Sequence, residues 1–203
     1  MFKRQHQRFT ERLESAFGPT GASVALFVVE VLQIIIVSLA IILPVRTYLI
    51  KPFVVRGASM EPNFYDREYL VIDELSYQFS KPVRGQIVVF RYPRDETQYF
   101  IKRVIGLPGE TVEVSDGRVT IYNAEFPIGH VLDESYIGSE QTLGKVRREL
   151  NEGEYFVMGD NRGYSLDSRS FGPITEEEII GRVWFRGFPF NRIGGFSLPD
   201  FNI

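Results

Sequence analysis

The sequence has no cysteine among its 203 residues and contains only two histidines, His6 and His130. The absence of cysteine excludes disulfides, thiol nucleophiles and zinc sites built on thiolates. Any histidine base would have to be one of the two residues named. The net charge is -3, so there is no basic excess of the kind that nucleic-acid binding requires, and we expect no nucleic-acid partner.

Aromatic and apolar residues are plentiful by contrast. The chain carries 17 Phe and 10 Tyr, and only 24% of its residues are charged. This composition argues against disorder and suits a β-rich fold. Roughly 160 residues follow the apolar stretch near the N-terminus, enough for one domain with a sizeable core.

Val24–Leu43 is the long apolar run, in which Glu30 and Gln33 are the only strongly polar residues. Twenty residues at about 1.5 Å each would cross a roughly 30 Å hydrocarbon core, so we predict a transmembrane helix over 23–43. A cleavable signal peptide is the competing interpretation, but the run is too long and no small-x-small site follows it. Glu30 is either a functional group or a tolerated protonated carboxyl.

The tail 1–22 sets the expected orientation. It carries four basic residues ahead of the apolar run, Lys3, Arg4, Arg8 and Arg12. The positive-inside rule therefore places the N-terminus in the cytoplasm and residues 44–203 on the outer side of the membrane.

Beyond the anchor, short runs rich in Val, Ile, Phe and Tyr alternate with turn residues, and we expect them to be strands. They are 53–56, 68–72, 85–91, 99–105, 155–159 and 180–186. Two further runs, 111–114 and 118–121, flank Ser115-Asp116-Gly117, whose Asp-Gly pair is typical of a hairpin turn. Residues 115–152 are interpreted as an insertion, and Thr175 as the cap of a short helix with an acidic first turn. The fold class predicted is mainly β, a barrel or sandwich.

Three segments carry the chemistry. The first is Arg56-Gly57-Ala58-Ser59-Met60-Glu61-Pro62, where small residues leave a hydroxyl accessible. The second is Phe100-Ile101-Lys102-Arg103-Val104 followed by Gly106-Leu107-Pro108-Gly109, where strand alternation places Phe100 and Lys102 on one face. An unprotonated lysine in an apolar setting can serve as the base that a serine nucleophile needs.

The third segment runs from Gly159-Asp160-Asn161-Arg162 to Ser165-Leu166-Asp167-Ser168-Arg169.

Taken alone, each of the three segments also has an ordinary structural explanation. Gly-Ala-Ser-Met is typical of a loop, a lysine in a strand usually marks an exposed face, and the third segment could be a polar turn. Core packing is an equal alternative for the apolar residues.

In this order, and after one membrane anchor, the segments closely resemble the bacterial type I signal peptidase family over about 44–194. The resemblance implies an antiparallel β-fold of coiled sheets. It also implies that Ser59 is the nucleophile and Lys102 the general base. Ser165 would orient the lysine, while Asp160, Asp167, Arg103 and Arg169 would form supporting ion pairs. The substrate cleft would be lined by Val55, Met60, Phe100 and Ile101.

The same resemblance implies a membrane-bound serine endopeptidase that removes signal peptides from exported preproteins at the outer face of the plasma membrane. It implies no metal or cofactor, and it makes preproteins, the lipid bilayer and the nearby secretion translocon the partners. One departure concerns Gly57, which stands where other members place a serine that contributes to the oxyanion hole. We expect Gly57→Ser to be tolerated on this basis.

Three rival functions remain. A Ser-Lys self-cleaving repressor should carry a DNA-binding head instead of a membrane span. A tethered β-domain without catalysis would have no need of Ser59, Lys102 and Ser165 together. A Ser-His enzyme would require His130, which lies in the predicted insertion. The C-terminal apolar side chains are expected to reach the lipid interface beside the anchor, with core packing as the alternative for Phe188 and Phe190. They are Phe188, Phe190, Phe196, Leu198 and Phe201.

Overall fold

The structure is a computed structural model that describes residues 2–44, 51–138 and 141–203. The chain divides into two compact units, Met1–Tyr48 and Leu49–Ile203. We describe each unit by itself, because their relative positions are not determined.

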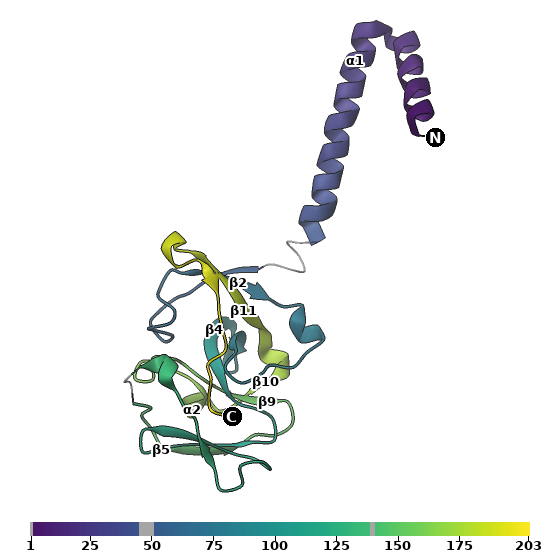
Figure 1. The fold of residues 1–203 in the computed structure, drawn as a ribbon. Coiled ribbons are helices and arrows are strands. Elements are labelled where there is room, and N and C mark those ends of the chain that lie inside the picture. The colour runs from purple at the N-terminus through teal and green to yellow at the C-terminus, as the bar shows by residue number, and fades with distance from the viewer. Residues whose placement is uncertain (1, 45–50, 139–140) are drawn as a thin grey trace. The chain divides into compact units, whose positions relative to one another are not determined.

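The first unit consists of helix α1, Phe2–Pro44, which Gly18 interrupts with non-helical angles (φ 71°, ψ 172°). Figure 1 shows a sharp bend near the start of the apolar part. Gly18–Leu43 is 26 residues long with a mean hydropathy of 2.8, which makes it long and apolar enough to cross a membrane. This segment contains the predicted span 23–43.

The second unit is built around a large antiparallel sheet with the strand order β1-β2-β11-β3-β4-β9-β10, and β12 pairs with β11. The strands are β1 Lys51–Val54, β2 Tyr69–Asp73, β3 Ile87–Tyr92, β4 Asp95–Gly106, β9 Glu154–Met158, β10 Ile174–Thr175, β11 Ile179–Phe188 and β12 Gly194–Gly195. Although β11 is near the C-terminus of the chain, it lies between β2 and β3 and pairs with both.

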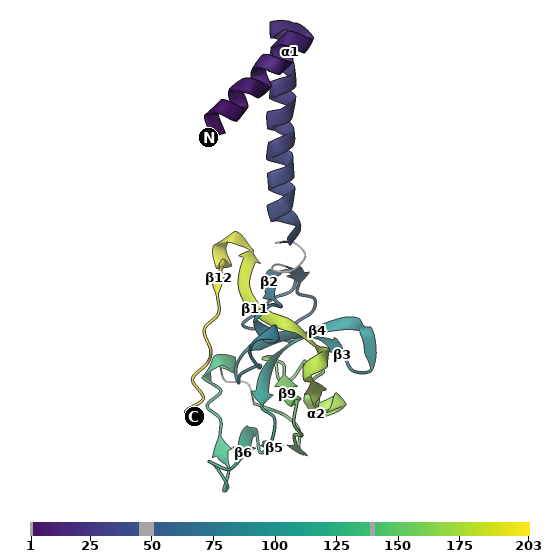
Figure 2. The same ribbon diagram turned by 90° about the vertical axis from the view of Figure 1, so that its right-hand side faces the viewer.

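A smaller sheet follows β4 in the chain, with the order β7-β6-β5-β8. Its strands are β5 Thr111–Ser115, β6 Arg118–Tyr122, β7 His130–Val131 and β8 Val146–Glu149. β5 and β6 pair as predicted around the Asp-Gly turn, where Asp116 and Gly117 both have positive φ. Figures 1 and 2 both place this sheet at the end of the domain opposite β2.

Short helices complete the second unit: α2 Ser168–Phe171 and the 3₁₀ turns Ser76–Gln78, Ser135–Ile137, Glu176–Glu178 and Phe190–Arg192. Thr175 begins the turn Glu176–Glu178, as predicted, and its N–H donates to the Glu178 carboxylate at 2.7 Å. The runs expected to be strands are all strands, with ends displaced by a few residues. The prediction of a mainly β, antiparallel fold is confirmed.

Three buried apolar clusters hold the domain together. One lies between β5, β6 and β9 and includes Val112, Ile121 and Phe156. The chain after β12 returns along the domain (Figure 2), and Phe201 enters this same cluster with only 6% of its surface exposed. The lipid contact considered for Phe201 is therefore wrong, because its ring is buried in protein. Phe188 and Phe190 remain exposed.

Candidate active site

Ser59 lies in the loop that joins β1 to β2. Backbone hydrogen bonds close the base of this loop, from Val55 N–H to Glu68 O and from Arg67 N–H to Val55 O, both at 2.9 Å. Gly57 has a φ of +83° and donates its N–H to the Asp66 carboxylate at 2.9 Å. The left-handed conformation at Gly57 lets the chain turn so that Ser59 faces Lys102 of strand β4.

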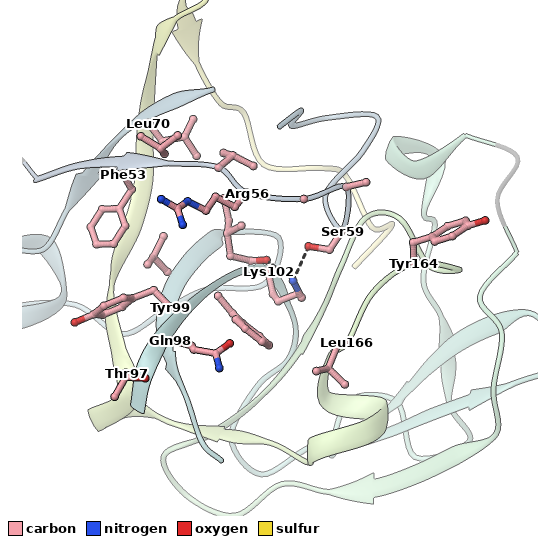
Figure 3. Close-up of a pocket in the computed structure, with 17 residues that line it drawn as sticks. Phe53, Arg56, Ser59, Leu70, Thr97, Gln98, Tyr99, Lys102, Tyr164 and Leu166 are labelled. Carbon is pink, nitrogen blue, oxygen red and sulfur yellow. Dashed lines mark hydrogen bonds between the residues drawn. The ribbon is translucent and has the colours of Figure 1, made fainter. Parts of the chain in front are cut away.

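Lys102 lies in the middle of β4, opposite Val88 of β3. Its Nζ lies 2.8 Å from Ser59 Oγ and donates to the Ile101 carbonyl oxygen at 2.7 Å. Figure 3 shows the two side chains pointing toward one another. Lys102 lies on the same face as Phe100, with Nζ 5.4 Å from the ring centroid, as strand alternation predicts.

The lysine is almost entirely removed from water, with 3% of its surface exposed. Burial lowers the pKa of Lys102 from 10.5 to about 8, against the opposing effect of the Asp167 and Asp160 charges, which favour the ammonium form. A considerable fraction of the amine is then neutral near physiological pH. A neutral amine still donates to the Ile101 carbonyl, and its lone pair can accept the proton of Ser59.

Two buried ion pairs support the segment 159–169. The carboxylate of Asp160 accepts from Arg103 Nε and Nη2 at 2.8 and 2.6 Å. The Arg103 guanidinium also lies over the Tyr136 ring. Asp167 accepts from Arg169 Nε and Nη2, both at 2.8 Å. Both carboxylates have no solvent exposure, so each requires its cationic partner.

The pKa of Asp167 is lowered because hydrogen bonds from Arg169 and its positive charge outweigh the desolvation that acts in the other direction. Asp167 Oδ2 also accepts from the Gly159 N–H at 3.1 Å. Strand β9 and the following turn are thereby tied to the start of α2.

Ser165 lies close to the dyad without bonding to it. Its Oγ is buried, and the Asp167 carboxylate is its candidate hydrogen-bond partner among the described residues, an interaction that helps to lower the pKa of that carboxyl. A β-carbon on Gly159 would overlap both Ser165 Oγ and the Ser59 carbonyl oxygen. Glycine at 159 therefore permits the close approach of the first and third segments.

Asn161 binds the nucleophile loop, a contact that sequence reasoning missed. Its N–H donates to the Ser59 carbonyl oxygen at 3.1 Å, and its side-chain amide donates to the Ala58 carbonyl oxygen at 3.0 Å. The sequence signal that could have indicated this contact was the position of Asn161 directly after Asp160. Nothing in the sequence indicated which backbone groups it would bind.

A cleft of about 640 Å³ opens beside the dyad. Three of the four residues expected to contact substrate line it, namely Val55, Phe100 and Ile101. Met60 is the exception. It is 1% exposed and packs with Phe64, so the structure places it in the core and not on the wall of the cleft.

The cleft has further walls that sequence reasoning missed. Figure 3 shows Phe53, Thr97 and Tyr99 on one side of the dyad and Tyr164 and Leu166 on the other. Strand β4 provides the lining residues Thr97 to Lys102. The length of this strand was the sequence signal that could have pointed to them. Among the described residues, no group of three or more histidine, aspartate and glutamate side chains is placed to hold a metal ion.

Comparison with known proteins identifies similar chains. A family model described as signal peptidase, peptidase S26 matches residues 28–188. The signal peptidase I of Leptolyngbya laminosa is 35% identical over 178 residues, covering 84% of this chain and 84% of that protein. A probable signal peptidase I of Synechocystis sp. is 37% identical over 175 residues, covering 83% of this chain and 86% of that protein.

A solved structure of a signal peptidase I from Enterococcus faecalis is 34% identical; the match covers 51% of this chain and 97% of that chain, with a TM-score of 0.44. The family model extends from within the apolar helix to the end of β11, which is most of the chain. The chain therefore belongs to the signal peptidase family, peptidase S26, and is a serine peptidase.

Proposed function

We propose that the chain is a membrane-anchored endopeptidase that removes N-terminal signal peptides from exported preproteins with a Ser59–Lys102 dyad. The observation that carries this proposal is the 2.8 Å contact between Lys102 Nζ and Ser59 Oγ in a site where the lysine is buried. A buried amine with a lowered pKa is a base, and the hydroxyl beside it is the group that such a base activates.

In the first step the neutral Lys102 amine accepts the proton of Ser59 as Oγ attacks the scissile carbonyl. The resulting tetrahedral oxyanion needs hydrogen-bond donors. The Ser59 N–H is available, because it makes no hydrogen bond within the described part of the chain, whereas the Gly57 N–H is held by Asp66. Lys102 then returns the proton to the leaving amine, and water, activated by the same amine, hydrolyses the acyl-enzyme.

Ser165 and the two ion pairs are assigned to positioning. Asp160–Arg103 joins the turn after β9 to β4, directly beside Lys102. Asp167–Arg169 holds the other end of the same segment. Ser165 Oγ is proposed to contact Lys102 when a substrate closes the site, since it is buried and its interaction with Asp167 falls short of a full hydrogen bond.

The substrate is proposed to lie extended in the cleft as an added strand, with small side chains against Val55, Phe100 and Ile101.

In the proposed topology, residues 1–22 form a cytoplasmic tail and 23–43 span the plasma membrane. Residues 44–203, with 115–152 as an insertion, form an extracytoplasmic domain. The basic residues Lys3, Arg4 and Arg8 support this orientation. The anchor would keep the enzyme at the bilayer, close to the translocon that delivers preproteins.

The direct test incubates the purified full chain in neutral detergent with a labelled preprotein and identifies the cut site by mass. We expect cleavage after a small residue, and a loss of at least about a thousandfold in both Ser59→Ala and Lys102→Met, because members of one dyad fail as a unit. The single tryptophan, Trp184 in β11, reports folding of each variant. Full activity in a folded Lys102→Met protein would refute the mechanism.

A further inference from the structure

The cleft contains one charged side chain besides the dyad lysine. Among the residues that the structure describes, Arg56 and Lys102 are the only charged ones that line it, and no described aspartate or glutamate does so. Arg56 is exposed, and none of the hydrogen bonds or ion pairs between described residues involves its side chain. Figure 3 shows its guanidinium group extending toward the side of the cleft where Phe53 lies.

Two carboxylates on the segments that border the cleft already have partners. Asp66 accepts from the Gly57 N–H at 2.9 Å and lies 3.4 Å from the Arg67 guanidinium. At the start of β4, Asp95 accepts from Thr97 and Gln98, each at 2.6 Å. A cationic group in a concave site without an internal anion raises the local concentration of anionic ligands. Arg56 is thus suited to meet a negative group that arrives with the substrate.

The geometry of β1 indicates which part of an extended peptide Arg56 would meet. β1 is the terminal strand of the sheet, and the Val55 N–H and carbonyl are both bonded to the β2 side. The backbone groups of Val54 and Arg56 consequently face the open edge. A peptide that adds to this edge places alternate side chains on opposite faces.

The two faces differ in chemistry. Val55 is buried, and Phe53 packs against the same apolar cluster, whereas Val54 and Arg56 are exposed. A signal-peptide cleavage site has small residues two positions apart, with any residue between them. The two small side chains share the apolar face, so the residue between them shares the face of Arg56.

We propose that Arg56 is a specificity-determining residue that pairs with an acidic side chain at the position between the two small residues of the cleavage site. This inference rests on the proposed function, because it requires an extended signal peptide in the cleft. It adds a preference for negative charge at the middle position of the small-x-small pattern, where the pattern itself accepts any residue.

The test uses the full chain in neutral detergent and three peptides that differ only in the residue between the two small ones: Asp, Asn or Lys. We expect kcat/KM for Asp to exceed that for Asn by about fivefold, the upper range for an exposed ion pair. The difference should lie mainly in KM and shrink as salt is raised, because the pair is solvent-accessible. Arg56→Gln should remove the preference, and Arg56→Glu should turn it toward Lys.

Arg118→Gln is the matched control, because Arg118 is an exposed arginine of β6 that does not line the cleft. It should keep the wild-type preference. Equal kcat/KM on all three peptides, or a preference for Asp that survives in Arg56→Gln, would overturn the assignment and leave the proposed function intact. Failure of the folded wild type to cut any peptide would overturn the proposed function and this inference with it.

A second arm separates the peptide from the membrane as the source of negative charge. The same variants are assayed in vesicles of zwitterionic lipid and in vesicles with added anionic phospholipid. If Arg56→Gln changes cleavage only with anionic vesicles, and equally for all three peptides, Arg56 binds lipid headgroups and the peptide assignment is wrong. A preference that follows the peptide in both vesicle types supports the assignment.

Discussion

Asn161 holds the backbone of the nucleophile: its N–H donates to the carbonyl oxygen of Ser59 at 3.1 Å. Its side chain binds the preceding carbonyl, that of Ala58. Asn161 follows Asp160, whose carboxylate is bonded to Arg103 next to Lys102. The same turn therefore positions the loop that carries the hydroxyl and the strand that carries the base, so the distance between them is set by one rigid segment.

The activity should depend on pH through Lys102. Its neutral form is the active one and its pKa is lowered to about 8, so kcat/KM on a peptide should rise with pH along an acid limb centred near 8. Well below that value the rate should fall about tenfold per pH unit, because the fraction of neutral amine falls in that proportion. Steady-state rates from about pH 6 to pH 10 measure the limb.

His130→Ala is the control for this limb. His130 lies in β7 of the small sheet, with Nε2 3.4 Å from the Phe201 carbonyl oxygen, and it does not line the cleft. The limb should be unchanged in this variant. Its disappearance would transfer the role of base to the histidine.

Lys102 should also lower the stability of the domain at neutral pH. Its folded-state pKa is about 8 against 10.5 for a free lysine, so the unfolded chain binds the proton more tightly. This cost is fully present below about pH 8 and is relieved as the pH rises from about 8 to 10.5. Between about pH 7 and pH 10 the wild type should therefore gain roughly 2 to 3 kcal/mol in unfolding free energy relative to Lys102→Met.

Denaturant unfolding followed by Trp184 fluorescence measures this difference. Lys145→Met, at an exposed lysine, is the control and should show no such pH-dependent difference. A constant difference between Lys102→Met and the wild type across the pH range would mean that the amine is not desolvated in the folded state.

Gly57→Ser should reduce both stability and activity. The sequence comparison suggested that a serine would be tolerated there, but Gly57 has a φ of +83°, which residues with a β-carbon rarely adopt. The strain should cost about 1 to 2 kcal/mol. Gly57→Ala, which adds no hydroxyl, should lose as much stability, and comparing kcat/KM of the two variants isolates the hydroxyl. A rise in kcat for Gly57→Ser alone would restore the oxyanion-hole role.

Asp160→Asn should destabilise the domain by about 3 to 5 kcal/mol, because it leaves the Arg103 guanidinium buried without its counter-charge. The matched control is Glu113→Gln, which removes the pair with Arg147, whose side chain is 57% exposed. That change should cost no more than about 1 kcal/mol. Equal losses in the two variants would contradict a special role for the buried pair.

Much of this fold was predictable because its signals are local. The turn at Asp116–Gly117 and the alternation of Phe100 and Lys102 depend on neighbouring residues, and both predictions are confirmed. The position of Met60 in the core and the conformation of Gly57 depend on contacts with segments distant in the sequence. The same holds for the far wall of the cleft at Tyr164 and Leu166, which only the folded chain brings beside Ser59.

The place of β11 in the large sheet sets the order in which the active site can be assembled. β1 and β2 border the serine loop, β4 carries the lysine and pairs with β3, and among the described strands of the sheet β11 alone joins the two pairs. During synthesis, residues 179–188 emerge after every other part of the dyad and its supports. Within the large sheet, the two strand pairs that border the dyad are therefore bridged only once residues 179–188 have been added, although the turn at Asp160 and Asn161 already ties the serine loop to β4.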